Sequence, residues 1–196
     1  MKRLGLLWLL VPIQVLAGAQ QYEPLADSVR VRLSRMVSDR AVPSMHFSSS
    51  SDAQRWLSEM DGRLAARIPD RKLRLELLRT LHYEATRARL DPQLVLGVIE
   101  VESGFRKYAL SKAGARGFMQ VMPFWVQLIG QRGHNLFHLR TNLAYGCVIL
   151  RHYLDLEKGD YFRALGRYNG SLGKGEYPRL VLAAWRGRWK YDGPTA

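Results

Sequence analysis

The chain has 196 residues, a formal net charge of +13 and one cysteine. A single cysteine excludes an intramolecular disulfide framework. No P-loop, dinucleotide-binding glycine pattern or metal-spaced His/Cys cluster occurs, so we expect neither a metal nor an organic cofactor. The positive charge favours anionic polymers as partners, but the arginines are scattered and no nucleic-acid recognition motif accompanies them. We therefore do not expect nucleic-acid binding.

The first 19 residues have the pattern of an export signal. Lys2 and Arg3 give a positive start, Leu4 to Leu16 is almost wholly apolar, and a small-x-small cleavage site ends at Ala19. The apolar run is too short for a stable membrane anchor, although a retained membrane-surface helix is an alternative. A lipoprotein signal would need cysteine where Ala19 stands. We therefore predict cleavage near Ala19, no transmembrane segment in the mature chain, and a periplasmic protein beginning near Gln20.

Helical periodicity dominates the rest of the chain, and no run alternates strongly enough to demand a strand. In chain order, the expected helices run from Val29 to Val37, from a capping box at Ser51 to Leu64, from Pro69 to Ala85, from Asp91 with Pro92 in the first turn, and over residues 141–156, 161–168 and 178–185.

These patterns predict a monomeric, all-α protein in four parts. Residues 1–19 are the signal peptide, 20–68 an N-terminal helical extension, 69–185 the helical catalytic core and 186–196 a loose C-terminal tail. Cys147 lies in an apolar helical stretch, so we interpret it as a buried structural thiol rather than a nucleophile.

Two carboxylates follow Asp91 on one predicted helix, with different surroundings. Residues three and four apart share a helix face, so Glu100 lies with Gly97 and other small or polar residues and should be solvated. Glu102 ends the apolar face that contains Val98, and it lies in the last turn, where the helix dipole disfavours an anion. Desolvation and dipole both predict a raised pKa for Glu102.

The size of that shift decides whether Glu102 can act as an acid. A glutamate with a pKa of about 4.3 is protonated in roughly one molecule in 500 at pH 7, whereas a pKa of about 6 brings the acid form near one in ten. A general acid for a glycosidic oxygen needs such a population. From the residues alone, the competing interpretation is a structural carboxylate paired with an arginine or lysine.

Three ordered motifs bear on this choice: Glu102-Ser103-Gly104-Phe105, the run from Ser111 to Pro123 that contains Gly114-Ala115-Arg116-Gly117-Phe118-Met119-Gln120, and Arg167-Tyr168-Asn169-Gly170. Together they closely resemble the soluble lytic transglycosylase family, whose domain is similar to a goose-type lysozyme. The resemblance covers about residues 75–185 and implies a lysozyme-like catalytic domain.

By this resemblance Glu102 is the catalytic acid/base. Ser111 would hydrogen-bond near Glu102 or a substrate acetamido group. The other implied substrate-binding residues are Gln120 and Met122 in the sugar cleft, Tyr168 on Glu102 or a substrate hydroxyl, and Asn169 as a brace of that loop. Asn142 and Gly146 fit a family helix motif that serves packing. Each of these residues also has an ordinary interpretation, as a cap, turn or core residue. Trp125 and Trp185 could stack on sugars, but core packing is favoured.

The sequence departs from the family pattern at several places. Phe118 replaces a usual leucine, and Arg167 and Gly170 replace alanines. Some members have a cleft glutamate four residues before a Tyr-Val pair, whereas Gly173 occupies that place here and Glu176 directly precedes Tyr177. These differences affect the outer cleft and leave the central acid unchanged.

The resemblance implies cleavage of the β-1,4 bond between N-acetylmuramic acid and N-acetylglucosamine in peptidoglycan, with formation of a 1,6-anhydro ring and no cofactor. The alternatives are a hydrolytic muramidase and a non-catalytic wall-binding component. Small exported proteins of this type often serve a secretion, conjugation or pilus apparatus, so such a partner is possible by analogy. The sequence does not distinguish endo from exo action.

Overall fold

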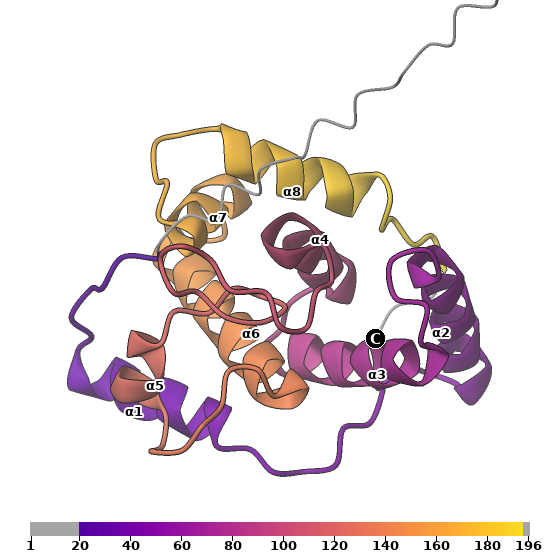
Figure 1. Ribbon diagram of the computed structural model, residues 1–196, viewed down its shortest axis with the longest axis horizontal. Coiled ribbons are helices and arrows are strands. Elements are labelled where there is room, and N and C mark those ends of the chain that lie inside the picture. Colours follow the sequence, from indigo (N-terminus) through magenta and orange to yellow (C-terminus); the bar gives the residue numbers. More distant parts are fainter. Residues whose placement is uncertain (1–19, 194–196) are drawn as a thin grey trace, which may run out of the picture.

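Helix α4 (Pro92–Ser103) lies in the middle of the fold, between α8 (Glu176–Arg186) and α3 (Arg71–Arg87) (Figure 1). The computed structural model describes residues 20–193, in which the chain forms eight α-helices and only isolated β-bridges. The other helices are α1 (Asp27–Val37), α2 (Ser50–Leu64), α5 (Phe124–Ile129), α6 (Leu139–Leu156) and α7 (Tyr161–Asn169). The prediction of an all-α protein is confirmed. The predicted signal peptide lies outside the described residues.

The sequence of α4 explains its central position. Asp91 caps the helix by accepting a hydrogen bond from the Gln93 backbone N–H at 2.7 Å, and Gly104 ends it in the left-handed region at φ 56°. Between these ends every residue from Leu94 to Ile99 is apolar and buried. A Cβ on Gly97 would lie 3.2 Å from backbone atoms of Val181 and Trp185, so glycine lets α8 approach closely. This contact places the start of α8 beside the end of α4.

Helix α6 holds the long loop that follows α4. The Asn142 side chain accepts from the Met119 N–H at 2.8 Å and donates to the carbonyls of Arg116 and Leu136 at 2.8 and 2.9 Å. A Cβ on Gly146 would lie 2.3 Å from the Met119 sulfur, so only glycine admits that side chain. Asn142 and Gly146 therefore have the packing role expected for them, and they fix residues 116–119 against α6.

All seven predicted helices are present, with shifted ends. The cap of α2 is Ser49, which accepts from the Asp52 N–H at 3.1 Å, and not Ser51. Asp70 caps α3, one residue beyond Pro69. Helix α5 was not predicted, because its six residues form too short a run to show helical periodicity. These differences leave the predicted architecture unchanged.

The N-terminal extension belongs to the same hydrophobic core as the rest of the chain. Leu33 of α1 and Trp56 and Met60 of α2 are at most 2% exposed and join one cluster with the buried residues of α3, α4 and α6. The boundary at residue 68 therefore stays a prediction. None of the helices in residues 20–193 is both long and apolar enough to span a membrane.

The prediction of a loose tail from residue 186 is wrong for the part that the structure describes. Trp189 is 1% exposed, its ring meets Phe105 edge-on at 5.4 Å, and its Nε1 donates to Glu100 at 2.7 Å. A tryptophan buries a large apolar area, which anchors the chain that carries it. The chain through Trp189 is therefore part of the packed core.

Candidate active site

Glu102 lies in the last turn of α4 with its side chain buried at 4% exposure. The Tyr177 hydroxyl, from the first turn of α8, donates to Glu102 Oε1 at 2.7 Å. No arginine or lysine among the described residues forms an ion pair with this carboxyl. Glu102 is thus neither in open water nor paired with a cation, the two arrangements that would count against an acid role.

The surroundings of Glu102 keep its carboxyl protonated. Burial raises the pKa of Glu102 to about 8, while the hydrogen bond from Tyr177 opposes this by lowering it. The direction agrees with the expectation from sequence, and the shift is larger. At pH 7 the acid form then exceeds the carboxylate by about ten to one. The group can therefore give up a proton at neutral pH, and the Tyr177 hydroxyl can stabilise the carboxylate that remains.

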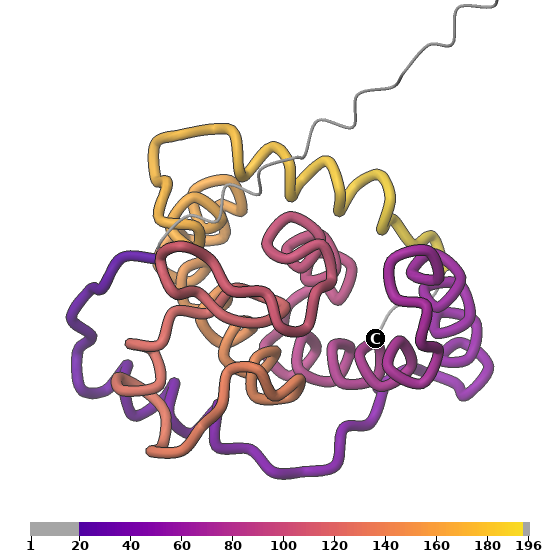
Figure 2. Tube along the Cα trace, in the orientation of Figure 1, coloured from indigo at the N-terminus to yellow at the C-terminus, as the bar shows by residue number. Residues whose placement is uncertain are grey.

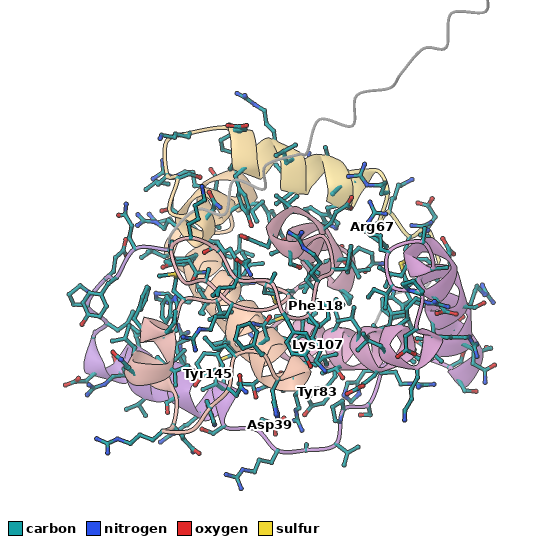
Figure 3. The ribbon with its side chains drawn as sticks, in the orientation of Figure 1. Asp39, Arg67, Tyr83, Lys107, Phe118 and Tyr145 are labelled. Carbon is teal, nitrogen blue, oxygen red and sulfur yellow. The ribbon has the colours of Figure 1, made fainter. Side chains whose placement is uncertain are left out.

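Glu100, two residues earlier, is held by cations, so the prediction that it is solvated is wrong. Its Oε1 pairs with Arg67 Nη2 at 2.6 Å and with Arg188 Nη2 at 2.8 Å, and its Oε2 accepts from Trp189 Nε1 at 2.7 Å. Arg67 lies beside α4 in Figure 3. Glu100 therefore joins α4 to the turn that follows α2 and to the C-terminal segment. It is a structural carboxylate.

We expect Glu100→Gln to lower the free energy of unfolding and to leave glycan cleavage nearly unchanged. Loss of the negative charge weakens the contacts with Arg67 and Arg188, at a cost of about 1–3 kcal/mol in the free energy of unfolding. Cleavage of cell-wall glycan per folded molecule should stay within about twofold of the parent, because a structural ion pair contributes nothing to proton transfer. Urea denaturation and a wall-digestion assay measure the two effects. A loss of cleavage as severe as that of Glu102→Gln would make Glu100 the catalytic carboxylate.

The Tyr168 hydroxyl makes a different contact from the one expected on Glu102. It donates to the Met119 carbonyl at 2.8 Å and is fully buried. Burial raises the pKa of Tyr168 well above its ordinary value, and the charge of Glu102 raises it further. The hydroxyl that holds Glu102 belongs instead to Tyr177, 75 residues along the chain from it. A role for Tyr168 on a substrate hydroxyl stays a prediction.

Gln120 and Ser111 shape the loop between α4 and α5. Gln120 is 3% exposed with φ 48°, and its Nε2 donates to the carbonyls of Ala109 and Gly117 at 3.1 and 2.9 Å. Ser111 Oγ accepts from the Ala115 N–H at 3.0 Å. The Gln120 amide therefore links the loop at Ala109 to the loop at Gly117, and Ser111 stabilises the turn from residue 111 to residue 115. Contacts of either side chain with substrate stay predictions.

The remaining candidates lie around the same loop. Met122 is half-buried, and Asn169, the last residue of α7, is 4% exposed. Their roles toward substrate also stay predictions. Trp125 is 2% exposed and Trp185 Nε1 donates to Asp91 at 2.8 Å, which favours the packing interpretation for both rings. Within residues 20–193, no three His, Cys, Asp or Glu side chains are grouped as metal ligands.

An all-α scaffold that buries a carboxyl under a tyrosine hydroxyl is a candidate acid–base site. The comparison with known families agrees with the motifs: residues 80–178 match the Transglycosylase SLT domain, and the chain belongs to that family. Both Glu102 and Tyr177 fall inside the matched range.

Two relatives extend this result. The chain is 32% identical over 103 residues to a protein named "Transglycosylase" from Enterobacteria phage PRD1, a match that covers 53% of this chain and 38% of the phage protein. It is 54% identical over 39 residues to "Membrane-bound lytic murein transglycosylase C" of Actinobacillus pleuropneumoniae serotype 5b, which covers 20% of this chain and 11% of that protein. The matches thus span well under two thirds of these relatives. No solved structure matches the chain.

Proposed function

We propose that this protein is a peptidoglycan lytic transglycosylase that uses Glu102 as both acid and base. The observation that carries the proposal is the Glu102 carboxyl, which is buried, forms no ion pair within residues 20–193 and accepts a hydrogen bond from Tyr177. Membership of the SLT domain family and the names of the two relatives support the same substrate class. A hydrolase of this kind would ordinarily need a second carboxylate, and the other carboxylate of α4, Glu100, is held by Arg67 and Arg188.

The proposed reaction needs one proton shuttle and no water. Protonated Glu102 donates its proton to the glycosidic oxygen as the bond from the muramic C1 to that oxygen breaks, and the N-acetylglucosamine side leaves with a hydroxyl. The positive charge that develops at C1 is met by the muramic C6 oxygen, whose proton passes to the Glu102 carboxylate as the C6 oxygen bonds to C1. Glu102 is protonated again at the end, so the cycle closes with a 1,6-anhydro product.

The mass of the product tests this scheme. Digestion of purified sacculi should release muropeptides that are lighter by one water than those released by a hydrolase. Products of the full hydrolytic mass would mean that a bound water takes the place of the C6 hydroxyl, which would make the protein a muramidase. Absence of any release would favour a non-catalytic wall-binding role. Glu102→Gln, assayed in parallel, excludes a contaminating enzyme as the source of either product.

We also propose that the protein acts in the periplasm, where its substrate lies. The export-signal pattern before Gln20 and the positive charge of the chain support this location. The intact mass of protein recovered from the periplasm should correspond to a chain that begins near Gln20. Recovery of the unprocessed chain from the cytoplasm would contradict the proposal.

A further inference from the structure

The side chain of Gln20 is buried against the segment that leads into α5. It is 5% exposed, and its Oε1 accepts two hydrogen bonds, from Trp125 Nε1 at 2.9 Å and from the Met122 backbone N–H at 3.3 Å. Figure 2 shows the indigo start of the described chain beside α7 and the loop that follows α4. A carboxamide near the start of the chain thus fills a position where two N–H donors converge on one carbonyl oxygen.

This position lies on the loop that also holds Tyr168. Burial raises the pKa of Tyr168 most strongly, the Glu102 charge raises it further, and the side chain of Gln20 lowers it. Tyr168 in turn donates to the carbonyl of Met119, in the same loop as Met122. Gln20 and Tyr168 therefore bind the same short segment of the loop, at Met122 and at Met119.

Gln20 fits this position only in part. Its Oε1 accepts two hydrogen bonds, but its Nε2 is buried and has no well-formed hydrogen bond to another described residue. A buried donor without a partner costs free energy. An acetamido group offers the same carbonyl oxygen and can place its methyl, which needs no partner, where Gln20 has Nε2. The site is thus better suited to an N-acetyl group than to glutamine.

The segment that carries Gln20 is held by contacts that are easily broken. We call residues 20–25 the N-terminal strap. Tyr22, 61% exposed, meets the Phe124 ring edge-on at 5.7 Å, and Glu23 pairs with Arg167 at 3.3 Å with its side chain 45% exposed. An exposed ion pair contributes little to stability. The strap can therefore leave its place at a modest cost.

We propose that the Met122 N–H and the Trp125 indole N–H form a subsite for the acetamido carbonyl of an N-acetylated amino sugar, and that Gln20 fills this subsite in the free protein. The strap then competes with the glycan, and the apparent affinity for glycan is reduced by the fraction of molecules in which Gln20 is bound. The choice of ligand rests on the proposed function, which this inference deepens.

Binding of short sugars to the full-length chain tests the proposal. Glu102→Gln serves as the background so that no ligand is cleaved, and titration calorimetry compares tri-N-acetylchitotriose with the deacetylated trimer. Gln20→Ala should tighten binding of the acetylated trimer about fivefold, the size of one net hydrogen bond, and leave the deacetylated trimer unchanged. Gln21→Ala, at the exposed neighbouring position, is the matched control and should change neither.

Unchanged or weaker binding of the acetylated trimer by Gln20→Ala would overturn the proposal. An equal gain in affinity for both trimers would also overturn it, because the strap would then hinder binding sterically and not by occupying a site for the acetamido group. The Trp125 indole N–H resonance, identified by its loss in Trp125→Phe, gives a second readout that does not require Gln20→Ala to fold. It should shift on addition of the acetylated trimer, and a resonance that stays in place would refute the subsite. Neither readout uses cleavage, so a failure here is distinct from a failure of the proposed function.

Discussion

Glu102→Gln is expected to lower the release of soluble muropeptides from purified sacculi by at least about a thousandfold. Acid–base catalysis by one positioned group contributes about 10²–10⁴, and in the proposed reaction this one group both donates and accepts the proton. Glutamine has nearly the same shape, and its Oε1 can still accept the hydrogen bond that Tyr177 donates to Glu102. The variant should therefore keep its fold and its ability to bind glycan. Substantial cleavage by a clean preparation would refute the assignment of Glu102.

The same substitution should stabilise the fold, by an amount that depends on pH. Burial raises the pKa of Glu102 from 4.5 to about 8, so between these values the folded state holds a proton that the unfolded state has released. The stability that this proton gives is complete below pH 4.5 and is lost as the pH rises to about 8. Glutamine stays neutral, so its advantage grows from near zero at pH 4 to several kcal/mol, at most about 5, at pH 8 and above.

Urea denaturation of the parent and of Glu102→Gln at pH 4 and pH 8 measures this difference. Glu100→Gln is the control, since that side chain contacts Arg67 and Arg188 and should lose stability at pH 8 rather than gain it. A Glu102→Gln variant no more stable than the parent at pH 8 would mean that the carboxyl is well solvated in solution.

The sequence alone was sufficient to predict that Glu102 is buried and that its pKa is raised. Val98 and Ile99 share its face of the helix, and Gly104 ends the helix two residues later, so burial and a raised pKa both follow from local spacing. Most helices were likewise predictable, because their apolar residues recur at three- and four-residue intervals. The burial of Glu102 could be predicted because the residues on which the prediction depends all lie in α4 and are close together in the sequence.

Contacts between distant segments could not be predicted in this way. The sequence predicts a solvated face of α4 at Gly97 and Glu100, but α8 packs against Gly97, and Glu100 is held by Arg67 and by the segment that follows α8. Periodicity defines the face of a helix and does not reveal what covers it. Nothing local indicates the contact of Tyr177 with Glu102 or that of Gln20 with Trp125, because the partners lie 75 and 105 residues apart in the chain.

Tyr177→Phe is expected to slow glycan cleavage about 10- to 100-fold and to move its pH dependence. A hydrogen bond to a charged group contributes about 1.5–3 kcal/mol, and the Tyr177 hydroxyl favours the ionised form of Glu102. Without it the pKa of Glu102 rises above about 8, so the proton is harder to donate. Because the protonated form begins the reaction, activity is present at low pH and is lost as the pH rises through that pKa. The alkaline limb of the rate profile should therefore shift to higher pH in the variant.

A purely structural role for Tyr177 would lower the rate without moving that limb, so the full pH profile of kcat/KM separates the two explanations. Tyr145→Phe is the matched control. It removes another buried tyrosine hydroxyl, one that bonds to His134 at 2.8 Å on a different part of the fold (Figure 3), and it should leave the limb where the parent has it. If Tyr177→Phe keeps the parent's alkaline limb, the hydroxyl does not set the proton affinity of Glu102. The buried environment alone would then account for the acid, and Tyr177 would serve to position α8.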